Sequence, residues 1–137
     1  MENKYYKRVK ESFDKQNFLG YIGANLEDAD YGSVIISCNN KPELTQQQGF
    51  LHGGLITTLA DVSCGYASLT TMPDDCEVLT VEFKINIMNA TKTDKLISKG
   101  KVIKTGKTLV ISEAVVTDST GGKIIAKMLS TMIVAKK

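Results

Sequence analysis

The sequence predicts an α+β domain in which an antiparallel sheet wraps around one long central helix. Two groups of strand-like segments flank a middle segment, residues 44–73, whose composition is different in kind. Those thirty residues contain one formal charge, Asp61, although 23% of the chain is charged. An exposed face would carry Lys and Glu, so we expect the middle segment to form a helix that is covered on both sides.

The first elements precede the central segment. Tyr6, Val9 and Phe13 recur at helical spacing among Lys, Arg and Glu, which predicts an amphipathic helix over residues 2–16. Residues 21–26 and 33–38 are rich in strand-forming side chains and flank the acidic segment 27–30. Acidic residues of this kind favour turns, so a hairpin with its turn at 27–30 is predicted.

Four further strands are predicted after the central segment, over residues 77–88, 95–104, 108–117 and 123–134. In the first of them, apolar residues from Leu79 to Ile87 alternate with polar residues, which indicates one buried and one more polar face. The segments 104–107 and 118–122 contain glycine and supply turns between the later strands.

The predicted central helix has two different sides. One is an apolar stripe at helical spacing, formed by Leu55, Leu59, Val62, Tyr66 and Leu69. The other is small and uncharged except for one carboxylate, and comprises Thr57, Thr58, Asp61, Cys64, Gly65 and Ser68. We infer that the sheet of the same chain covers one side and that a second surface approaches the other closely, which leaves Asp61 partly buried.

Composition excludes several classes of protein. The 137 residues are expected to form one domain, residues 1–137, and a net charge of +2 argues against a dedicated nucleic-acid binder. The three cysteines are widely spaced without a CxxC pair, and together with a single histidine they offer no metal-ligand set. No signal core or membrane span is recognised, so a cytoplasmic location and no membrane partner are expected.

His52, the only histidine, precedes Gly53 and Gly54 at the start of the predicted helix. Paired glycines let a ligand approach the backbone, and the first N–H groups of a helix lack internal partners and carry partial positive charge. A developing oxyanion would be stabilised there. The alternative is a plain turn into the helix with a surface histidine.

Asp61 is the second candidate, because a carboxylate in surroundings with few charges can act as a general base or nucleophile. The alternative is a capping or backbone-paired Asp. Gly53 and Asp61 are separated by eight residues, or about 12 Å along a helix and about 80° around it. One chain therefore cannot bring both to the same atom, whereas a two-fold dimer with antiparallel helices brings Gly53 of one chain opposite Asp61 of the other.

These residues resemble a known family. The pattern of Gln46, Gly49, His52-Gly53-Gly54, Leu59 and Asp61, followed by 80–85 (Thr-Val-Glu-Phe-Lys-Ile), is similar to the hotdog-fold acyl-CoA thioesterases of the phenylacetic-acid-degradation type. The resemblance covers nearly the whole chain. It implies the hotdog fold, an acyl-CoA substrate, no cofactor, and homodimers often paired into homotetramers with sites between subunits.

The resemblance also implies roles for individual residues. The Gly53 N–H polarises the thioester carbonyl with help from the Gln46 amide, and His52 lies near the thioester. Asp61 of the partner chain activates water or attacks directly, and Thr80 holds the water. The family commonly has Asn in place of Gln46 and often Ser in place of Thr80.

Three points stay open at this level. Lys104 and Lys107 lie in a turn that the resemblance brings near the coenzyme A phosphates, but solvated turn lysines fit equally. A non-catalytic acyl-CoA binding or sensing protein on the same fold is the second functional hypothesis, and a dehydratase is the third. The acyl group depends on which residues line the pocket, the candidates being Phe50, Leu51, Tyr66, Leu69 and Met72.

Overall fold

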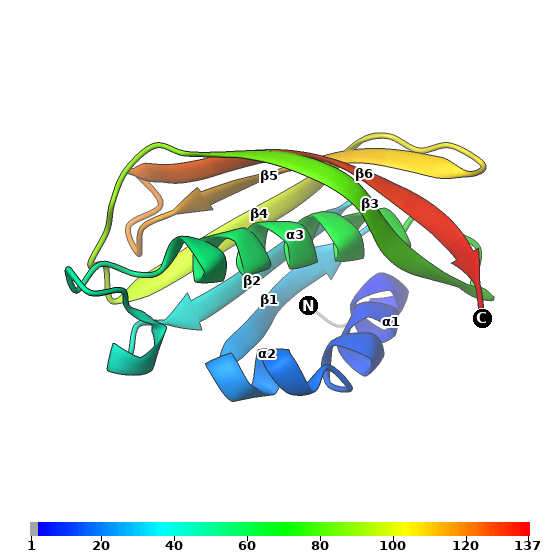
Figure 1. Ribbon diagram of the computed structural model, residues 1–137. Helices are drawn as coiled ribbons and strands as arrows, with labels where there is room; N and C mark the ends of the chain where they lie inside the picture. The colour runs from blue at the N-terminus through cyan, green and yellow to red at the C-terminus, as the bar shows by residue number, and fades with distance from the viewer. Residues whose placement is uncertain (1–2) are drawn as a thin grey trace.

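The computed structural model describes residues 3–137, in which one antiparallel sheet curves around a central helix (Figure 1). The sheet has six strands in the order β1-β2-β4-β5-β6-β3. The strands are β1 (Ala24–Asp30), β2 (Ser33–Asn39), β3 (Cys76–Ile87), β4 (Lys95–Lys104), β5 (Leu109–Thr117) and β6 (Ile124–Lys136). The helices are α1 (Lys4–Phe13), α2 (Asn17–Ile22) and α3 (Gly53–Leu69), with a short 3-10 turn at Pro42–Leu44.

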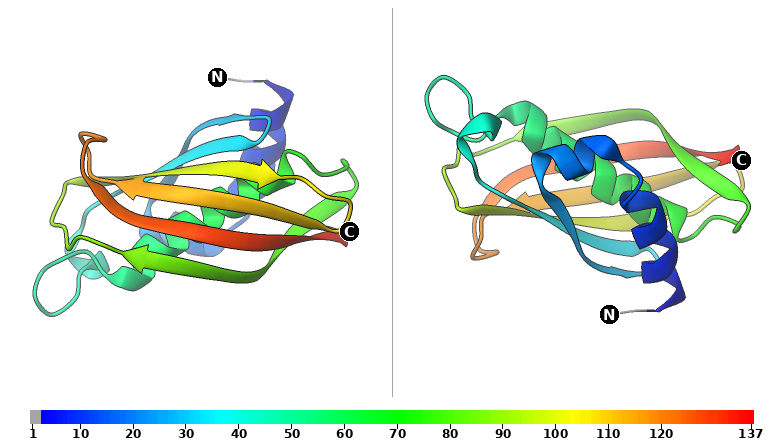
Figure 2. Two further views of the ribbon diagram at one scale, coloured as in Figure 1. Left: turned by 90° about the horizontal axis from the view of Figure 1, so that it is seen from above. Right: turned by 90° about the horizontal axis from the view of Figure 1, so that it is seen from below.

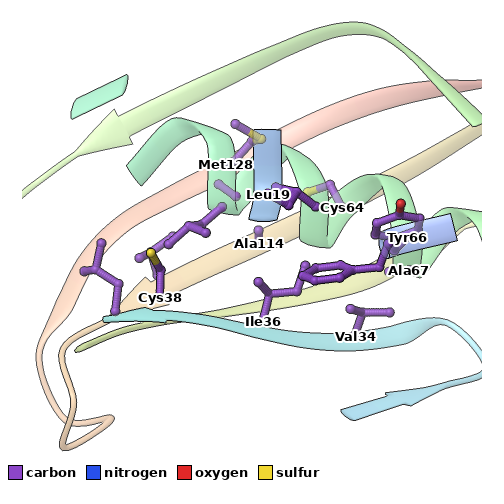
Figure 3. Packing of buried hydrophobic residues seen from close by; sticks show 14 of the residues in the cluster. Leu19, Val34, Ile36, Cys38, Cys64, Tyr66, Ala67, Ala114 and Met128 are labelled. Carbon is purple, nitrogen blue, oxygen red and sulfur yellow. The ribbon is translucent and has the colours of Figure 1, made fainter. Parts of the chain in front are cut away.

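The predicted central helix and the four later strands are confirmed, with strand ends displaced by at most two residues. Helix α3 lies against the inner face of the sheet and shares one buried cluster with it, as Figure 3 shows for Val34 and Ile36 of β2 and for Cys64 and Ala67 of α3. The approach is close: a Cβ on Gly100 of β4 would lie 2.2 Å from the Ser63 carbonyl oxygen. Glycine is thus required where β4 passes under the helix.

Buried serines fix the helix on the sheet. Ser63 of α3 hydrogen-bonds to Ser98 of β4 at 2.7 Å, and Ser68 donates to Ser112 of β5 at 3.1 Å. The prediction that Cys64 and Ser68 face a second surface is wrong, because both side chains are buried against the chain's own sheet. Small side chains in that row serve the close approach of helix and sheet.

The predicted N-terminal hairpin is wrong in its first half. Tyr21 and Ile22 belong to helix α2, which ends at Gly23 in the left-handed conformation with φ 80°. The predicted turn, 27–30, lies within β1, and the chain reverses after it at Gly32, where φ is 73°. Glycine adopts this conformation without steric cost, so Gly32 rather than the acidic residues fixes the turn.

Helices α1 and α2 cover the side of α3 that faces away from the sheet (Figure 2). The predicted helix over residues 2–16 is confirmed for Lys4–Phe13, and its predicted first residue lies outside the described range. Arg8, the one arginine, donates to the carbonyl oxygens of Leu69 and Met72 at 3.0 and 2.7 Å. It thereby ties α1 to the C-terminal end of α3, where helix carbonyls lack partners.

Strand β3 ends the sheet, so one of its edges has no partner strand in the described chain. It is twelve residues long and carries large exposed apolar side chains, among them Leu79 (59% exposed), Val81 (53%) and Phe83 (40%). A long apolar edge of this kind is a template for strand pairing.

Within residues 3–137, no helix combines the length and apolar character needed to cross a bilayer.

Candidate active site

The start of α3 presents one unpaired N–H group. His52 is the N-cap residue, and its Nδ1 accepts a hydrogen bond from the Gly54 N–H at 2.7 Å. Because Nδ1 accepts, the proton of a neutral imidazole sits on Nε2. Among the described residues, no hydrogen-bond partner is found for the Gly53 N–H. The cap thus engages the Gly54 N–H and leaves the Gly53 N–H without a partner within the described residues.

Asp61 lies two turns further along the helix and is half-buried, as the sequence predicted. Its Oδ1 accepts a hydrogen bond from the Thr80 hydroxyl of β3 at 2.8 Å. Burial raises the pKa of the Asp61 carboxyl above its ordinary value, and the Thr80 hydrogen bond lowers it in part. A raised pKa makes a carboxylate a stronger base.

A cleft of about 440 Å³ opens beside this carboxylate, between α3, β3 and the end of α1. Asp61 and Gly65 lie one turn apart on its helical wall, and Thr80 lies on its strand wall. The remaining lining residues are Ser12, Gln16, Val62, Tyr66, Glu77, Val78 and Leu79. Asp61 therefore lies in the wall of a concave, partly apolar site, whose other carboxylate is that of Glu77.

Gly53 and Asp61 belong to the same straight element, since α3 runs unbroken from Gly53 to Leu69. Their separation is therefore about 12 Å at 1.5 Å per residue. Strand β3 follows the helix in the opposite direction: a Cβ on Gly53 would lie 3.2 Å from Ile87 Cδ1, and Thr80 bonds Asp61. Within one chain, Gly53 therefore lies beside Ile87 and Asp61 lies beside Thr80, at two separate positions along β3.

Gln46 lies in the loop before the helix, and its side chain is engaged there. Its amide oxygen accepts from the N–H groups of Gln48 and Phe50 at 2.6 and 3.2 Å, and its amide nitrogen donates to the Gln48 side chain. The Gln46 side chain therefore bonds within its own loop and not at the start of α3 beside the Gly53 N–H. A contact of Gln46 with substrate stays a prediction.

Lys104 and Lys107 are not brought to the helix start within one chain. They flank Thr105, whose hydroxyl donates to Thr71 at 2.9 Å, just beyond the C-terminal end of α3. The turn thus lies at the end of the helix opposite to Gly53. Both lysines are exposed.

The cysteines lie in the protein core. Cys38, Cys64 and Cys76 are buried free thiols. Burial raises the pKa of the Cys64 thiol to about 11, which makes it a poor nucleophile. In the part of the chain that the structure describes, no three His, Cys, Asp or Glu side chains gather in a way that could hold a metal ion.

Sequence reasoning missed the contribution of α1 and of the start of β3 to the cleft. Ser12, Gln16 and Glu77 line it, whereas the sequence predicts only an amphipathic helix over 2–16 and a strand over 77–88 there. Tyr66 was one of the candidate lining residues and does line the cleft, whereas Leu51, Leu69 and Met72 are buried in the core. The i, i+4 spacing of Ser12 and Gln16 would not have pointed to a shared partner either, because α1 ends at Phe13 and Gln16 is the N-cap residue of α2.

Comparison with known proteins identifies the family of this chain. Residues 48–125 match the model of the thioesterase superfamily, and this match includes the helix start, Asp61 and Thr80. Human acyl-coenzyme A thioesterase 13 is 31% identical over 121 residues, which cover 87% of this chain and 86% of that protein.

Solved structures agree on the fold. A thioesterase family protein from Silicibacter pomeroyi is 33% identical, with a TM-score of 0.93 over 97% of this chain and 99% of that chain. The E. coli PaaI protein from the phenylacetic acid degradation operon is 14% identical, with a TM-score of 0.87 over 98% of this chain and 94% of that chain. The predicted sheet around a central helix, with its resemblance to hotdog thioesterases, is confirmed.

Proposed function

Because the chain belongs to the thioesterase superfamily, we propose that it hydrolyses acyl-coenzyme A thioesters to a free acid and coenzyme A, at two equivalent sites shared across a homodimer. The observation that carries the proposal is the pair formed by Asp61 and Gly53. A half-buried carboxylate with a raised pKa and a free N–H at a helix start lie on one helix, too far apart to act within one chain.

The two groups perform complementary halves of the reaction. The ionised Asp61 takes a proton from a water molecule, and the resulting hydroxide attacks the thioester carbonyl carbon. The carbonyl oxygen becomes an oxyanion that the Gly53 N–H stabilises. The oxyanion re-forms the carbonyl as the C–S bond breaks, and the coenzyme A thiolate leaves and takes up the proton that Asp61 accepted, which returns Asp61 to its ionised form. In the alternative, the ionised Asp61 carboxylate attacks the same carbon and expels the thiolate, and water then hydrolyses the resulting anhydride to the free acid and the Asp61 carboxylate.

In this proposal, two chains pair through their β3 strands. Thr80 is the residue of β3 that contacts Asp61, and Ile87 is the residue of β3 that lies beside Gly53. Because β3 has a β-bulge between Thr80 and Glu82, Thr80 and Ile87 share one face of the strand and lie three pairing positions on either side of Lys84. If two β3 strands pair antiparallel about a two-fold axis at Lys84, the partner's Thr80 falls opposite Ile87. The partner's Asp61 then comes to the helix start.

Other residues of this site have supporting roles in the proposal. His52 is exposed, and with Nδ1 engaged it presents Nε2 outward beside the thioester. Gly54 has no side chain to block the approach of substrate to the helix start. Lys104 and Lys107 reach coenzyme A phosphates only if another chain brings them there, because each lies at the far end of its own α3.

Two such dimers form a tetramer in this proposal. The outer face of the sheet carries exposed apolar side chains, among them Leu109 and Leu129. A patch of this kind on a soluble protein commonly marks an interaction surface. The second dimer is proposed to pack there.

The function is tested with short, medium, long-chain and aromatic acyl-CoAs and detection of the released thiol. We expect hydrolysis that persists after exhaustive chelation of metals, since an Asp base and an oxyanion donor need no metal. Binding of acyl-CoAs without turnover would instead identify a binding or sensing protein. Activity that disappears on chelation and returns with zinc would contradict the mechanism.

The Thr80→Val variant tests whether the hydrogen bond from the Thr80 hydroxyl of β3 lowers the pKa of Asp61. The wild-type kcat should fall as the pH drops through the Asp61 pKa, because a protonated carboxyl accepts no proton. Loss of the hydroxyl removes the interaction that lowers this pKa, so the acid limb of the profile should move to higher pH. The plateau kcat should fall by less than about tenfold.

The control for this variant is Thr80→Ser, which keeps the hydroxyl and should keep the wild-type limb. The profile of kcat against pH is measured for all three proteins. If the acid limb of the kcat profile of Thr80→Val lies at the same pH as that of the wild type, Thr80 does not act through Asp61.

A further inference from the structure

Arg8 of α1 bonds the connection between α3 and β3 at both of its ends. Its Nη1 atom donates hydrogen bonds to the carbonyl oxygens of Leu69 and Met72 at 3.0 and 2.7 Å. Its Nη2 atom donates to those of Pro73 and Cys76 at 2.6 and 3.2 Å. Leu69 is the last residue of α3 and Cys76 is the first of β3. Arg8 and these carbonyls, called the Arg8 clamp below, therefore join the end of the helix to the start of the strand.

The planar guanidinium suits this contact, and a lysine ammonium does not. Each terminal nitrogen of arginine carries two N–H groups, so the two nitrogens supply one donor for each of the four carbonyls. An ammonium has its three N–H groups around one point. Arg8 also lies 3.9 Å from the carboxylate of Asp74, but that carboxylate is fully exposed, so the ion pair contributes little. The main-chain carbonyls are thus the partners that fix Arg8.

Other contacts of the connection, residues 70–75, bond single positions. Thr105 donates to Thr71 at 2.9 Å, and the Lys137 N–H donates to the Asp75 carbonyl at 3.3 Å. The backbone hydrogen bonds within the connection run to carbonyls three or four residues earlier, so they shape local turns only. Among the described residues, Arg8 is the side chain whose hydrogen bonds reach both ends of the connection.

The helix and the strand that leave the Arg8 clamp lead to the two partners of one hydrogen bond at the site. Asp61 precedes Leu69 by eight residues, or about 12 Å along a helix. Thr80 follows Cys76 by four residues, or about 13 Å along a strand. These two segments line the cleft, and between them the Thr80 hydroxyl donates to Asp61 Oδ1 at 2.8 Å. The separation of α3 and β3 at the clamp therefore governs how closely the hydroxyl approaches the carboxylate.

Strand β3 is weakly held next to Thr80. Within the described chain it pairs on one side only, with β6. A β-bulge between Thr80 and Glu82 interrupts this pairing, and a bulge leaves one residue unpaired and bends its strand. The hydroxyl thus belongs to a short segment, residues 76–80, that runs from the Arg8 clamp to the bulge.

We propose that Arg8 is a positioning residue of the active site, which keeps the Thr80 hydroxyl on Asp61 by holding both ends of the connection. The inference rests on the proposed function, in which Asp61 is the base. Arg8 acts through position and not through its charge, because burial and the Thr80 hydrogen bond are the causes that shift the Asp61 pKa.

The surroundings of Asp61 leave the Thr80 hydrogen bond as the contact that lowers its pKa, while burial raises it. Among the described residues that line the cleft, Glu77 of β3 carries the other charge. The remaining polar groups on this part of α3 and on the elements packed against it are neutral in the pH range where a carboxyl titrates. They are Ser12, Gln16, Cys64, Tyr66, Ser98 and Ser112.

The test compares kcat against pH for the wild type, Arg8→Lys and Arg8→Met. Loss of the Arg8 clamp weakens the Thr80 hydrogen bond, so the Asp61 pKa should rise and the base should ionise only at higher pH. The acid limb should move to higher pH, as in Thr80→Val and by no more. On that limb kcat should fall by about threefold, while the plateau kcat and KM stay within about twofold. Arg8→Lys keeps the charge, so a shift in both variants assigns the effect to the guanidinium hydrogen bonds.

The double variant Arg8→Met with Thr80→Val shows whether Arg8 acts through Thr80. Its acid limb should coincide with that of Thr80→Val, because the hydroxyl that Arg8 positions is already absent. The matched control is Asn3→Ser, which keeps an N-cap side chain on α1 but removes the hydrogen bond from Asn3 Nδ2 to the Ala29 carbonyl at 3.0 Å. It loosens α1 from β1 and not from the connection, so its limb should stay at the wild-type pH.

Titration of the Asp61 carboxyl carbon, followed by NMR, measures the same effect without turnover. Its midpoint should rise in both Arg8 variants. If no acyl-CoA is hydrolysed and the midpoint still rises, the positioning role stands and the proposed function fails. If no acyl-CoA is hydrolysed and the midpoint does not move, both fail.

Other outcomes would overturn the inference and leave the function standing. An acid limb at the wild-type pH in both Arg8 variants is one of them, and a lower melting temperature would then give Arg8 a structural role only. A limb that moves in Arg8→Met but not in Arg8→Lys would assign the effect to charge. A further shift when Arg8→Met is added to Thr80→Val would show that the effect runs through another group of the cleft, such as Glu77. If neither Arg8 variant folds, Arg8 serves the fold and not the site.

Discussion

Replacing Asp61 by Asn is expected to lower kcat by about 10²-fold or more, while the dissociation constant for acyl-CoA changes little. The amide is almost the size of the carboxylate, and its oxygen can still accept the hydrogen bond from Thr80. What is lost is the ability to take a proton from water or to attack the thioester. Asp61 is half-buried, and burying a neutral amide costs no more than burying a carboxylate, so the fold should persist.

Three measurements separate chemistry from structure in this variant. Thermal unfolding should match that of the wild type, calorimetry should give a similar affinity for acyl-CoA, and thiol release should be nearly absent. Near wild-type kcat at any pH would remove Asp61 from the mechanism. Loss of binding together with loss of turnover would mean that the carboxylate holds the substrate rather than reacting with it.

Much of the fold was predictable because its signals are local. The near absence of charge from residue 44 to residue 73 follows directly from burial, and the structure confirms the helix that it predicts. The alternation that begins at Leu79 predicts a strand, which is confirmed as β3, but the apolar face that it was expected to bury is exposed within one chain, with Leu79 and Val81 more than half exposed. The first hairpin was not predictable in the same way. The acidic residues of β1 are common in turns, but a glycine with positive φ at Gly32 fixes the reversal two residues later.

The candidate site was predictable only in part. Asp61 and Gly53 stand out by their residue types, and their distance on a helix follows from regular geometry. The contacts of Gln46 with its own loop depend on a side-chain conformation that residue type does not specify. The hydrogen bonds of the Tyr66 hydroxyl in the cleft join residues fifty or more positions apart, so they form only when the N-terminal segment packs on α3.

Mixing two inactive variants should restore about a quarter of wild-type activity if Gly53 and Asp61 act across the dimer. One parent is Asp61→Asn and the other is Gly53→Pro, which deletes the proposed oxyanion donor. Proline is tolerated at the first position of a helix, and His52 already has the extended conformation that a residue before proline needs, with ψ 138°. Loss of one oxyanion donor typically costs about 10²- to 10³-fold in rate.

Gly53→Ala is the matched control for the second parent. Alanine and proline both add a Cβ, which meets the mobile end of the Ile87 side chain at 3.2 Å, but alanine keeps the N–H. Gly53→Ala should therefore retain far more activity than Gly53→Pro. Similar losses in the two variants would assign the effect to steric contact with Ile87 and not to the missing donor.

The expected quarter follows from counting sites. Random reassociation of equal amounts makes half of the dimers mixed, and in each mixed dimer one site carries both substitutions and the other carries neither. Activity should rise as the subunits exchange, which tagged subunits allow to be measured independently. If exchange is complete and activity stays at the level of the parents, Gly53 and Asp61 act within one chain, or one of them takes no part in the reaction.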